Sequence, residues 1–153
     1  MYHGATRPYP LTMRVSSKDE AKSYYDSAKE TYALGHYKTA LDLAKQAVYA
    51  STDWPEAYVL YYFCNLRVGD TADDQAARAY KDAAYLALDN LRRICSNKGL
   101  SVEDEMSKFV AAFPETKAWA ESLKKKTQYY TVATLTAGAL LSFWVVSKLR
   151  SGA

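Results

Sequence analysis

The side chains that most often carry chemistry in proteins are sparse in this sequence. Its histidines, His3 and His36, lie far apart along the chain and lack the spacing of metal ligands. The cysteines, Cys64 and Cys95, stand within helical patterns and form neither a Cys-x-x-Cys redox motif nor a disulfide framework. Because free cysteine is among the most buried residue types, we expect two buried thiols here.

Catalytic motifs are missing as well. The chain contains no phosphate-binding loop, dinucleotide fingerprint, zinc-protease motif or nucleophile elbow. Asp70, Asp73 and Asp74 form an acidic cluster, but this cluster lacks the ligand pattern and terminal glutamate of a calcium loop. We interpret it as a solvated turn that caps the next helix. The sequence therefore predicts a protein that is not an enzyme and has no cofactor and no metal.

The charges are distributed unevenly along the 153 residues. Residues 19–123 hold all 17 acidic residues and 12 of the 20 basic ones, whereas every charged residue in the segments on either side is basic.

A hydrophobic content of 49% excludes a mainly disordered chain. The net charge of +3 is too small to indicate nucleic acid, so we expect no nucleic-acid partner.

The elements that would position these residues are helices. Ser17 and Glu20 have the spacing of a capping box and begin a helix that we expect to end before Gly35. A second helix is expected from Lys38 to about Ala50.

Pro55 opens a third predicted helix, because proline in a first turn loses no hydrogen bond. We expect this helix to reach Val68 and to end at Gly69. The following stretch, DTADDQ, is expected to lengthen the next turn, and a fourth helix should continue to Ile94. Ser101 then caps a short helix with Phe109 and Phe113 on it.

The predicted first four helices show a sequence repeat with a period of 34 residues. Gly35 and Gly69 are 34 positions apart, and so are Tyr24 and Tyr58. Small residues recur in the second helix at Ala40, Ala44 and Ala47, followed by Pro-Glu-Ala-Tyr at 55–58. Over residues 24–69 the chain resembles the tetratricopeptide-repeat family, which has this period.

The resemblance implies an all-α domain of antiparallel helix hairpins, with Gly35 and Gly69 in the inter-helix turns. It places Ala40 and Ala47 where neighbouring helices cross most closely. It also implies that first-helix residues line a concave face, which yields a candidate protein-interaction surface of Tyr24, Tyr25, Tyr58, Tyr61 and Tyr62. The alternative is that these tyrosines only let their hydroxyls reach water.

The last stretch of the chain has the pattern of a membrane span. Residues 129–146 contain no charge and would extend about 27 Å as a helix, close to the hydrocarbon thickness of a bilayer. Basic residues flank this stretch at Lys124–Lys126 and at Lys148 and Arg150. We therefore expect one long helix from about Glu115 to Lys148 that continues into a single transmembrane span. A buried core helix is the alternative.

Small residues share one face of this predicted span. They are Ala133, Thr134, Ala137, Gly138 and Ser142. Such faces let a second helix approach closely in lipid. The predicted organisation is an extended arm at 1–16, a helical domain at 17–123, a transmembrane helix at 124–148 and a short tail at 149–153. The arm is basic, but Pro8 and Pro10 make it a poor match to a transit segment.

Two functions fit this organisation, and both are binding functions. In the first, the chain is a structural accessory subunit of a mitochondrial respiratory-chain or ATP synthase complex, and contacts other subunits through the helical domain, the arm and the span. In the second, it is a tail-anchored outer-membrane adaptor or import receptor, a layout similar to that of the fission adaptor Fis and the plant-type Tom receptor. The short, moderately apolar span suits a mitochondrial membrane, with the inner membrane favoured. Membrane lipid is a partner in both.

Overall fold

The computed structural model describes residues 17–126 of the chain, and every regular element in this range is an α-helix. The prediction of an all-α fold is therefore confirmed for this part of the chain. The helices are α1 (Ser17–Ala33), α2 (Tyr37–Ala50), α3 (Pro55–Thr71), α4 (Asp74–Lys98), α5 (Val102–Ala112) and α6 (Pro114–Lys126).

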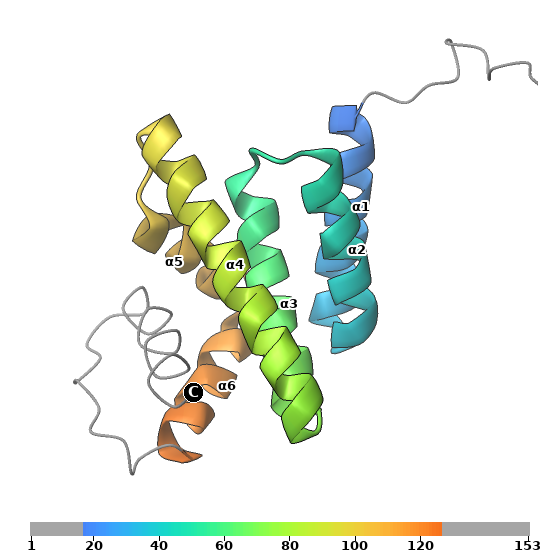
Figure 1. Ribbon diagram of the computed structural model, residues 1–153, viewed down its shortest axis with the longest axis vertical. Coiled ribbons are helices and arrows are strands. Elements are labelled where there is room, and N and C mark those ends of the chain that lie inside the picture. The colour runs from blue at the N-terminus through green and yellow to red at the C-terminus, as the bar shows by residue number, and fades with distance from the viewer. Residues whose placement is uncertain (1–16, 127–153) are drawn as a thin grey trace, which may run out of the picture.

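The helices pack as two antiparallel pairs with α3 at the centre. Helix α1 lies along α2 and α3 lies along α4, while α2 packs against α3 and joins the two pairs (Figure 1). Helix α5 covers α3 from another side and also touches α4, and α6 packs on α5. Because α3 has neighbours on several sides, ten of its residues are buried, from Pro55 to Leu66.

The small residues of α2 lie fully inside this packing. Ala40, Ala44 and Ala47 are all fully buried, on a helix that has α1 on one side and α3 on the other. An alanine adds little thickness between two helix axes, which allows α2 to lie close to both partners. The alanine stripe thus provides the points of close approach, while Leu41 and Val48 are larger side chains that α2 also buries.

The two repeat glycines have different roles, and the prediction for Gly69 is wrong. Gly35 lies in the turn between α1 and α2 with φ of +82°, a left-handed conformation that glycine adopts without steric cost. Gly69 lies inside α3, which continues to Thr71. A Cβ atom on Gly69 would lie 3.1 Å from Cβ of Tyr80 on α4, so the glycine permits close helix approach.

The DTADDQ stretch does not lengthen the turn after α3, in contrast to the prediction. Its first residues extend α3, and only Ala72 and Asp73 link the two helices. Asp73 caps α4 by accepting a hydrogen bond of 2.9 Å from the backbone N–H of Ala76. The interpretation of this acidic cluster as a helix-capping turn is therefore confirmed for Asp73.

Helix α4 runs further than predicted, to Lys98, where Gly99 ends it in a left-handed conformation. The side chain of Ser101 then accepts from the backbone N–H of Asp104 and caps α5, as predicted. Pro114 begins α6 directly after the single residue Phe113. Whether α6 forms part of one long helix to Lys148 lies outside the described residues.

An aromatic cluster ties α5 to the first hairpins. The ring of Phe109 on α5 stacks on Phe63 of α3 with centroids 4.7 Å apart, and its edge contacts Tyr32 of α1 at 5.4 Å. Phe113 contacts the same Tyr32 ring at 5.1 Å. Such ring pairs add roughly 0.5–1.5 kcal/mol each beyond the area they bury. This cluster makes α5 part of the main core.

Candidate interaction surface

Two of the five tyrosines predicted to form an interaction surface are not on the surface. Tyr62 is fully buried and Tyr58 retains only 7% exposure. Both belong to α3, which α2, α4, α5 and α1 all contact, so adjacent residues of this helix can both face protein. Burial raises the pKa of the Tyr62 hydroxyl far above its ordinary value. The prediction is therefore wrong for Tyr58 and Tyr62.

The other three tyrosines, Tyr24, Tyr25 and Tyr61, are half-buried and pack against the edge of the core. The geometry does not bring the five residues together on one concave face. Of these five residues, Tyr25 lines a hollow in the surface.

Tyr25 and Trp54 form the aromatic base of a hollow of about 520 Å³ beside the start of α1. Their ring centroids are 4.5 Å apart, and the ammonium group of Lys29 lies 4.7 Å from the centre of the Tyr25 ring. Burial raises the pKa of Tyr25 to about 12, and the carboxylates of Glu56, Asp26 and Glu105 add to this shift. The phenol therefore stays neutral and can act as a hydrogen-bond donor at physiological pH.

The rim of this hollow carries both signs of charge. Asp26 pairs with Lys22 and with Lys29, and Asp53 pairs with Lys98 at 3.7 Å. Hydrogen bonding from Lys22 lowers the pKa of Asp26. Because these pairs are largely exposed, each contributes little to stability and its charges can exchange partners at low cost. The hollow suits an amphipathic protein segment better than a small ion of one sign.

A second site centres on Arg67 of α3. Its guanidinium carbon lies 4.6 Å from the ring centre of Tyr37 on α2 and 4.4 Å from that of Trp119 on α6. The Nε group donates to the Tyr32 hydroxyl at 3.4 Å, and Nη2 donates to the backbone carbonyl of Glu115 at 3.3 Å. Arg67 therefore joins four helices, and its side chain is held in one orientation.

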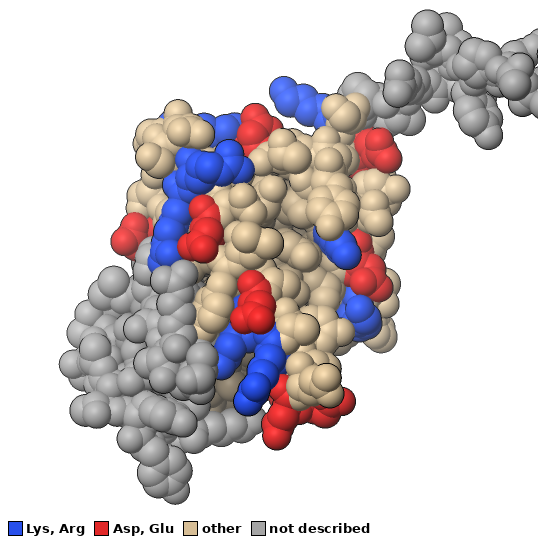
Figure 2. All heavy atoms as spheres, in the orientation of Figure 1, with Lys and Arg blue, Asp and Glu red and all other residues tan. Residues whose placement is uncertain are grey.

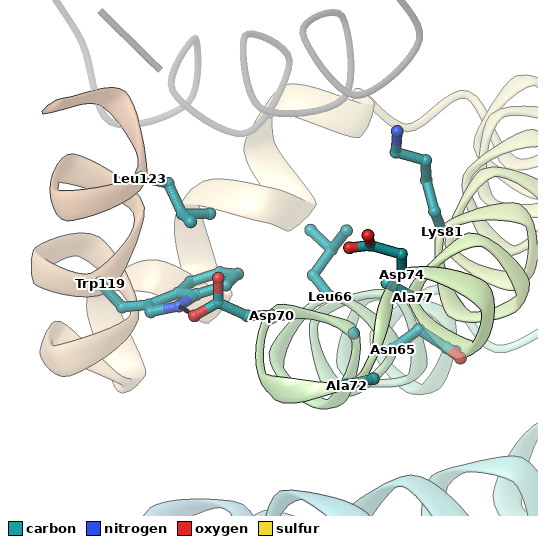
Figure 3. A pocket seen from close by; sticks show the side chains of 10 residues that line it. Asn65, Leu66, Asp70, Ala72, Asp74, Ala77, Lys81, Trp119 and Leu123 are labelled. Atoms are coloured by element: carbon teal, nitrogen blue, oxygen red, sulfur yellow. Dashed lines mark hydrogen bonds between the residues drawn. The ribbon is translucent and has the colours of Figure 1, made fainter. Parts of the chain in front are cut away.

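Trp119 also borders a hollow of about 260 Å³ between α6 and the junction of α3 with α4 (Figure 3). Its indole N–H donates to Asp70 at 3.0 Å, and in Figure 3 Leu123 on α6 and Leu66 on α3 face each other across the opening. Thr116, fully buried on α6, lies 2.8 Å from the Tyr32 hydroxyl. These polar contacts help to dock α6 on the hairpins, together with Ala120 and Trp119, which pack on the apolar core.

The two cysteines of the described residues are not reactive thiols. Cys64 and Cys95 are free and buried, as predicted, and burial raises the pKa of both thiols, so neither is an activated nucleophile. Within residues 17–126, no group of three or more histidine, cysteine or carboxylate side chains is placed to hold a metal ion. Figure 2 shows acidic and basic side chains interspersed on one face, with uncharged surface between them.

Arg67 and Phe109 are structurally important residues whose roles the sequence did not reveal. The spacing of Phe109 and Phe113, four positions apart, indicates one apolar helix face, but it does not say which helix receives that face. A lone arginine in a helical stretch gives no local signal at all, since its partners Tyr37 and Trp119 are 30 and 52 positions away.

No protein-family model matches the chain, and neither a curated protein nor a solved structure matches it significantly. Among the helices within residues 17–126, none combines the length and apolar character needed to cross a membrane. The predicted span and its small-residue face lie outside the described residues. That face comprises Ala133, Thr134, Ala137, Gly138 and Ser142.

Proposed function

We propose that this chain is a non-enzymatic, membrane-anchored protein-interaction subunit with a tetratricopeptide-like helical domain. In this proposal it is an accessory subunit of a mitochondrial respiratory-chain or ATP synthase complex. The observation that carries the proposal is the position of α6, which packs on α5 and donates from Trp119 to Asp70, and whose described part reaches Lys126, three residues before the uncharged stretch 129–146. A domain followed so closely by such a stretch would be held near a bilayer surface.

The packing of the first four helices supports the tetratricopeptide-like part of the proposal. Two antiparallel pairs stack through α2 and α3, Gly35 is left-handed in the first turn, and the alanines of α2 are fully buried. Helix α3 departs from the repeat by ending one turn later than a strict copy of α1 would. The departure adds length to the second hairpin and leaves the pairwise stacking in place.

The surface supports binding through contact. Leu34, Tyr49 and Leu86 are large apolar side chains with exposures of 73%, 67% and 64%. Single exposed apolar residues are common on soluble domains. Such side chains also become buried when a protein interface forms. Together with the Tyr25–Trp54 hollow, they provide contact points on several sides of the domain.

Membrane extraction of the full chain tests the anchoring. We expect the full chain to stay with membranes at alkaline pH in carbonate, and a chain that lacks residues 127–153 to be released. A truncated chain that remains in the membrane fraction, or a full chain that is extracted, would contradict the proposal.

Native electrophoresis after mild solubilisation tests the assignment to a complex. We expect the chain to co-migrate with oxidative-phosphorylation subunits and to resist protease on intact mitochondria. A free chain that protease removes from intact mitochondria would instead identify an outer-membrane adaptor or import receptor, the alternative function.

A further inference from the structure

A third hollow, of about 440 Å³, lies between the start of α2 and the second half of α3. Its cationic lining residues are Lys38 and Arg67, His36 adds an imidazole ring, and its described lining contains no aspartate or glutamate. Thr39 and Thr71 add hydroxyl groups to the same lining. The hollow therefore presents hydrogen-bond donors and positive charge, which is the chemistry that an oxyanion requires.

Arg67 is prepared for such a ligand. Two aromatic rings and two hydrogen bonds fix its guanidinium. Among the described residues, these hydrogen bonds use Nε, which donates to the Tyr32 hydroxyl, and Nη2, which donates to the Glu115 carbonyl. Within residues 17–126, no carboxylate lies within ion-pair distance of Arg67. A guanidinium held in place loses little entropy when it binds an oxyanion through its remaining N–H groups.

Lys38 can join Arg67 at the hollow. Its ammonium group is paired with Asp42 at 3.4 Å, but both side chains are more than 60% exposed, so this pair is weak and readily exchanged. A phosphate group held by Arg67 in the hollow would offer Lys38 a second anionic partner besides this carboxylate. Asp42 and Tyr80 do not line the hollow, and both compete for Lys38, since its ammonium nitrogen pairs with Asp42 and lies 5.8 Å from the centre of the Tyr80 ring.

We propose that this hollow binds the phosphate group of an anionic phospholipid. This inference rests on the proposed membrane attachment, because Arg67 stacks on Trp119 of α6, the helix that precedes the uncharged stretch 129–146. Figure 1 places the turn between α1 and α2, the turn between α3 and α4 and the end of α6 toward the same end of the molecule. A bilayer that receives the chain after α6 would thus lie near this hollow.

A lipid titration of the full chain in mild detergent tests the inference. Native mass spectrometry would count bound short-chain phosphatidylglycerol, with short-chain phosphatidylcholine as the neutral comparison and inorganic phosphate as the free anion. We expect Arg67→Gln and Lys38→Gln each to weaken phosphatidylglycerol binding about fivefold, since each lost charge near a headgroup is worth roughly 1 kcal/mol. Lys45→Gln, an exposed lysine on the same helix, is the matched control and should change binding less than about twofold.

Three results would overturn the inference. They are equal binding of the two lipids, equal weakening by Lys38→Gln and Lys45→Gln, and displacement of phosphatidylglycerol by inorganic phosphate at equal concentration. Circular dichroism identifies a misfolded Arg67→Gln chain, in which case Lys38→Gln decides alone. The titration does not require residues 127–153 to cross a bilayer. A chain that binds phosphatidylglycerol here but fails the extraction test therefore overturns the proposed anchoring and leaves this site standing.

Discussion

Gly35 and Gly69 occupy equivalent positions of the 34-residue repeat, but glycine is favoured at the two positions for different physical reasons. At Gly35 the backbone is left-handed and a Cβ atom would have no neighbour within 4 Å. At Gly69 the backbone is helical and a Cβ atom would press on Cβ of Tyr80, an atom that cannot move without α4. Backbone conformation therefore selects glycine at the first position, and packing selects it at the second.

Alanine and asparagine should rank in opposite order of stability at these two glycines. At Gly35 we expect alanine to cost about 1 kcal/mol and asparagine less, because asparagine tolerates the left-handed region better. At Gly69 we expect alanine to be tolerated better than asparagine, whose larger side chain adds overpacking of roughly 1–3 kcal/mol to a poorer helix propensity. Urea unfolding of the four full-length variants measures the order. The same order at both positions would contradict the two roles.

Buried tyrosines should make the fold sensitive to alkali. Burial raises the pKa of Tyr32 to about 12, despite the opposing effect of its hydrogen bonds to Thr116 and Arg67. The unfolded pKa is about 10, so the folded state holds this proton more tightly between these values. The free energy of unfolding should therefore be unaffected by this group below about pH 10 and should fall as the pH rises toward 12.

Unfolding measured between pH 8 and 11.5 checks this expectation. Tyr32→Phe should make the decline with pH shallower, whatever its effect at neutral pH. Tyr49→Phe removes a hydroxyl from a side chain that is 67% exposed and should leave the slope unchanged. A decline of the same steepness in Tyr32→Phe would show that other groups cause the alkaline instability.

At the scale of elements, helix positions followed from local signals, while the surroundings of each helix did not. Pro55, Ser101 and Gly35 mark helix ends through short-range chemistry, and the structure places an end at or beside each of them. The burial of Tyr58 and Tyr62 depends on how many helices surround α3, which no pattern within α3 encodes. The Arg67 site likewise needs partners from α1, α2 and α6, so it could be found only once the fold was known.

The alanine stripe of α2 permits a packing test. Ala47→Leu adds a large side chain where α2 meets its neighbours at full burial, and we expect a loss of roughly 1–3 kcal/mol. Gln46→Leu introduces the same side chain at the adjacent, exposed position and should change stability by less than about 0.5 kcal/mol. Thermal unfolding of both variants gives the comparison. Equal stabilities would mean that α2 has room at Ala47.

Helix α6 should be the element most easily detached from the domain. Its fully buried or nearly buried residues are Thr116 and Ala120, and Trp119 provides much of its remaining contact. We expect Trp119→Ala to raise hydrogen exchange across residues 114–126 while α1–α4 keep their protection, because those pairs do not depend on the indole. Lys117→Ala, an exposed change on the same helix, should leave exchange unaltered. Loss of protection throughout the chain would contradict this separation.

At the scale of the whole molecule, helices would associate for different physical reasons in the described domain and in the uncharged stretch. The domain buries an aromatic core in water, where apolar area drives packing. In lipid that drive is absent, and a helix associates through close approach at small residues. The proposed subunit would therefore hold its partners by two kinds of contact, and each can be disturbed without the other.

The small-residue face of the predicted span offers a test of the second contact. Gly138→Ile places a branched side chain at the centre of the face formed with Thr134 and Ser142, and should reduce recovery of the membrane complex. Thr136→Ile introduces the same side chain on the opposite side of the predicted helix, although as a smaller enlargement, and should leave recovery unchanged. Recovery is measured by native electrophoresis after mild solubilisation, with carbonate extraction as the check that both variants remain in the membrane. If Gly138→Ile assembles as well as Thr136→Ile, the partner helix must pack elsewhere, or the complex is held by the helical domain alone.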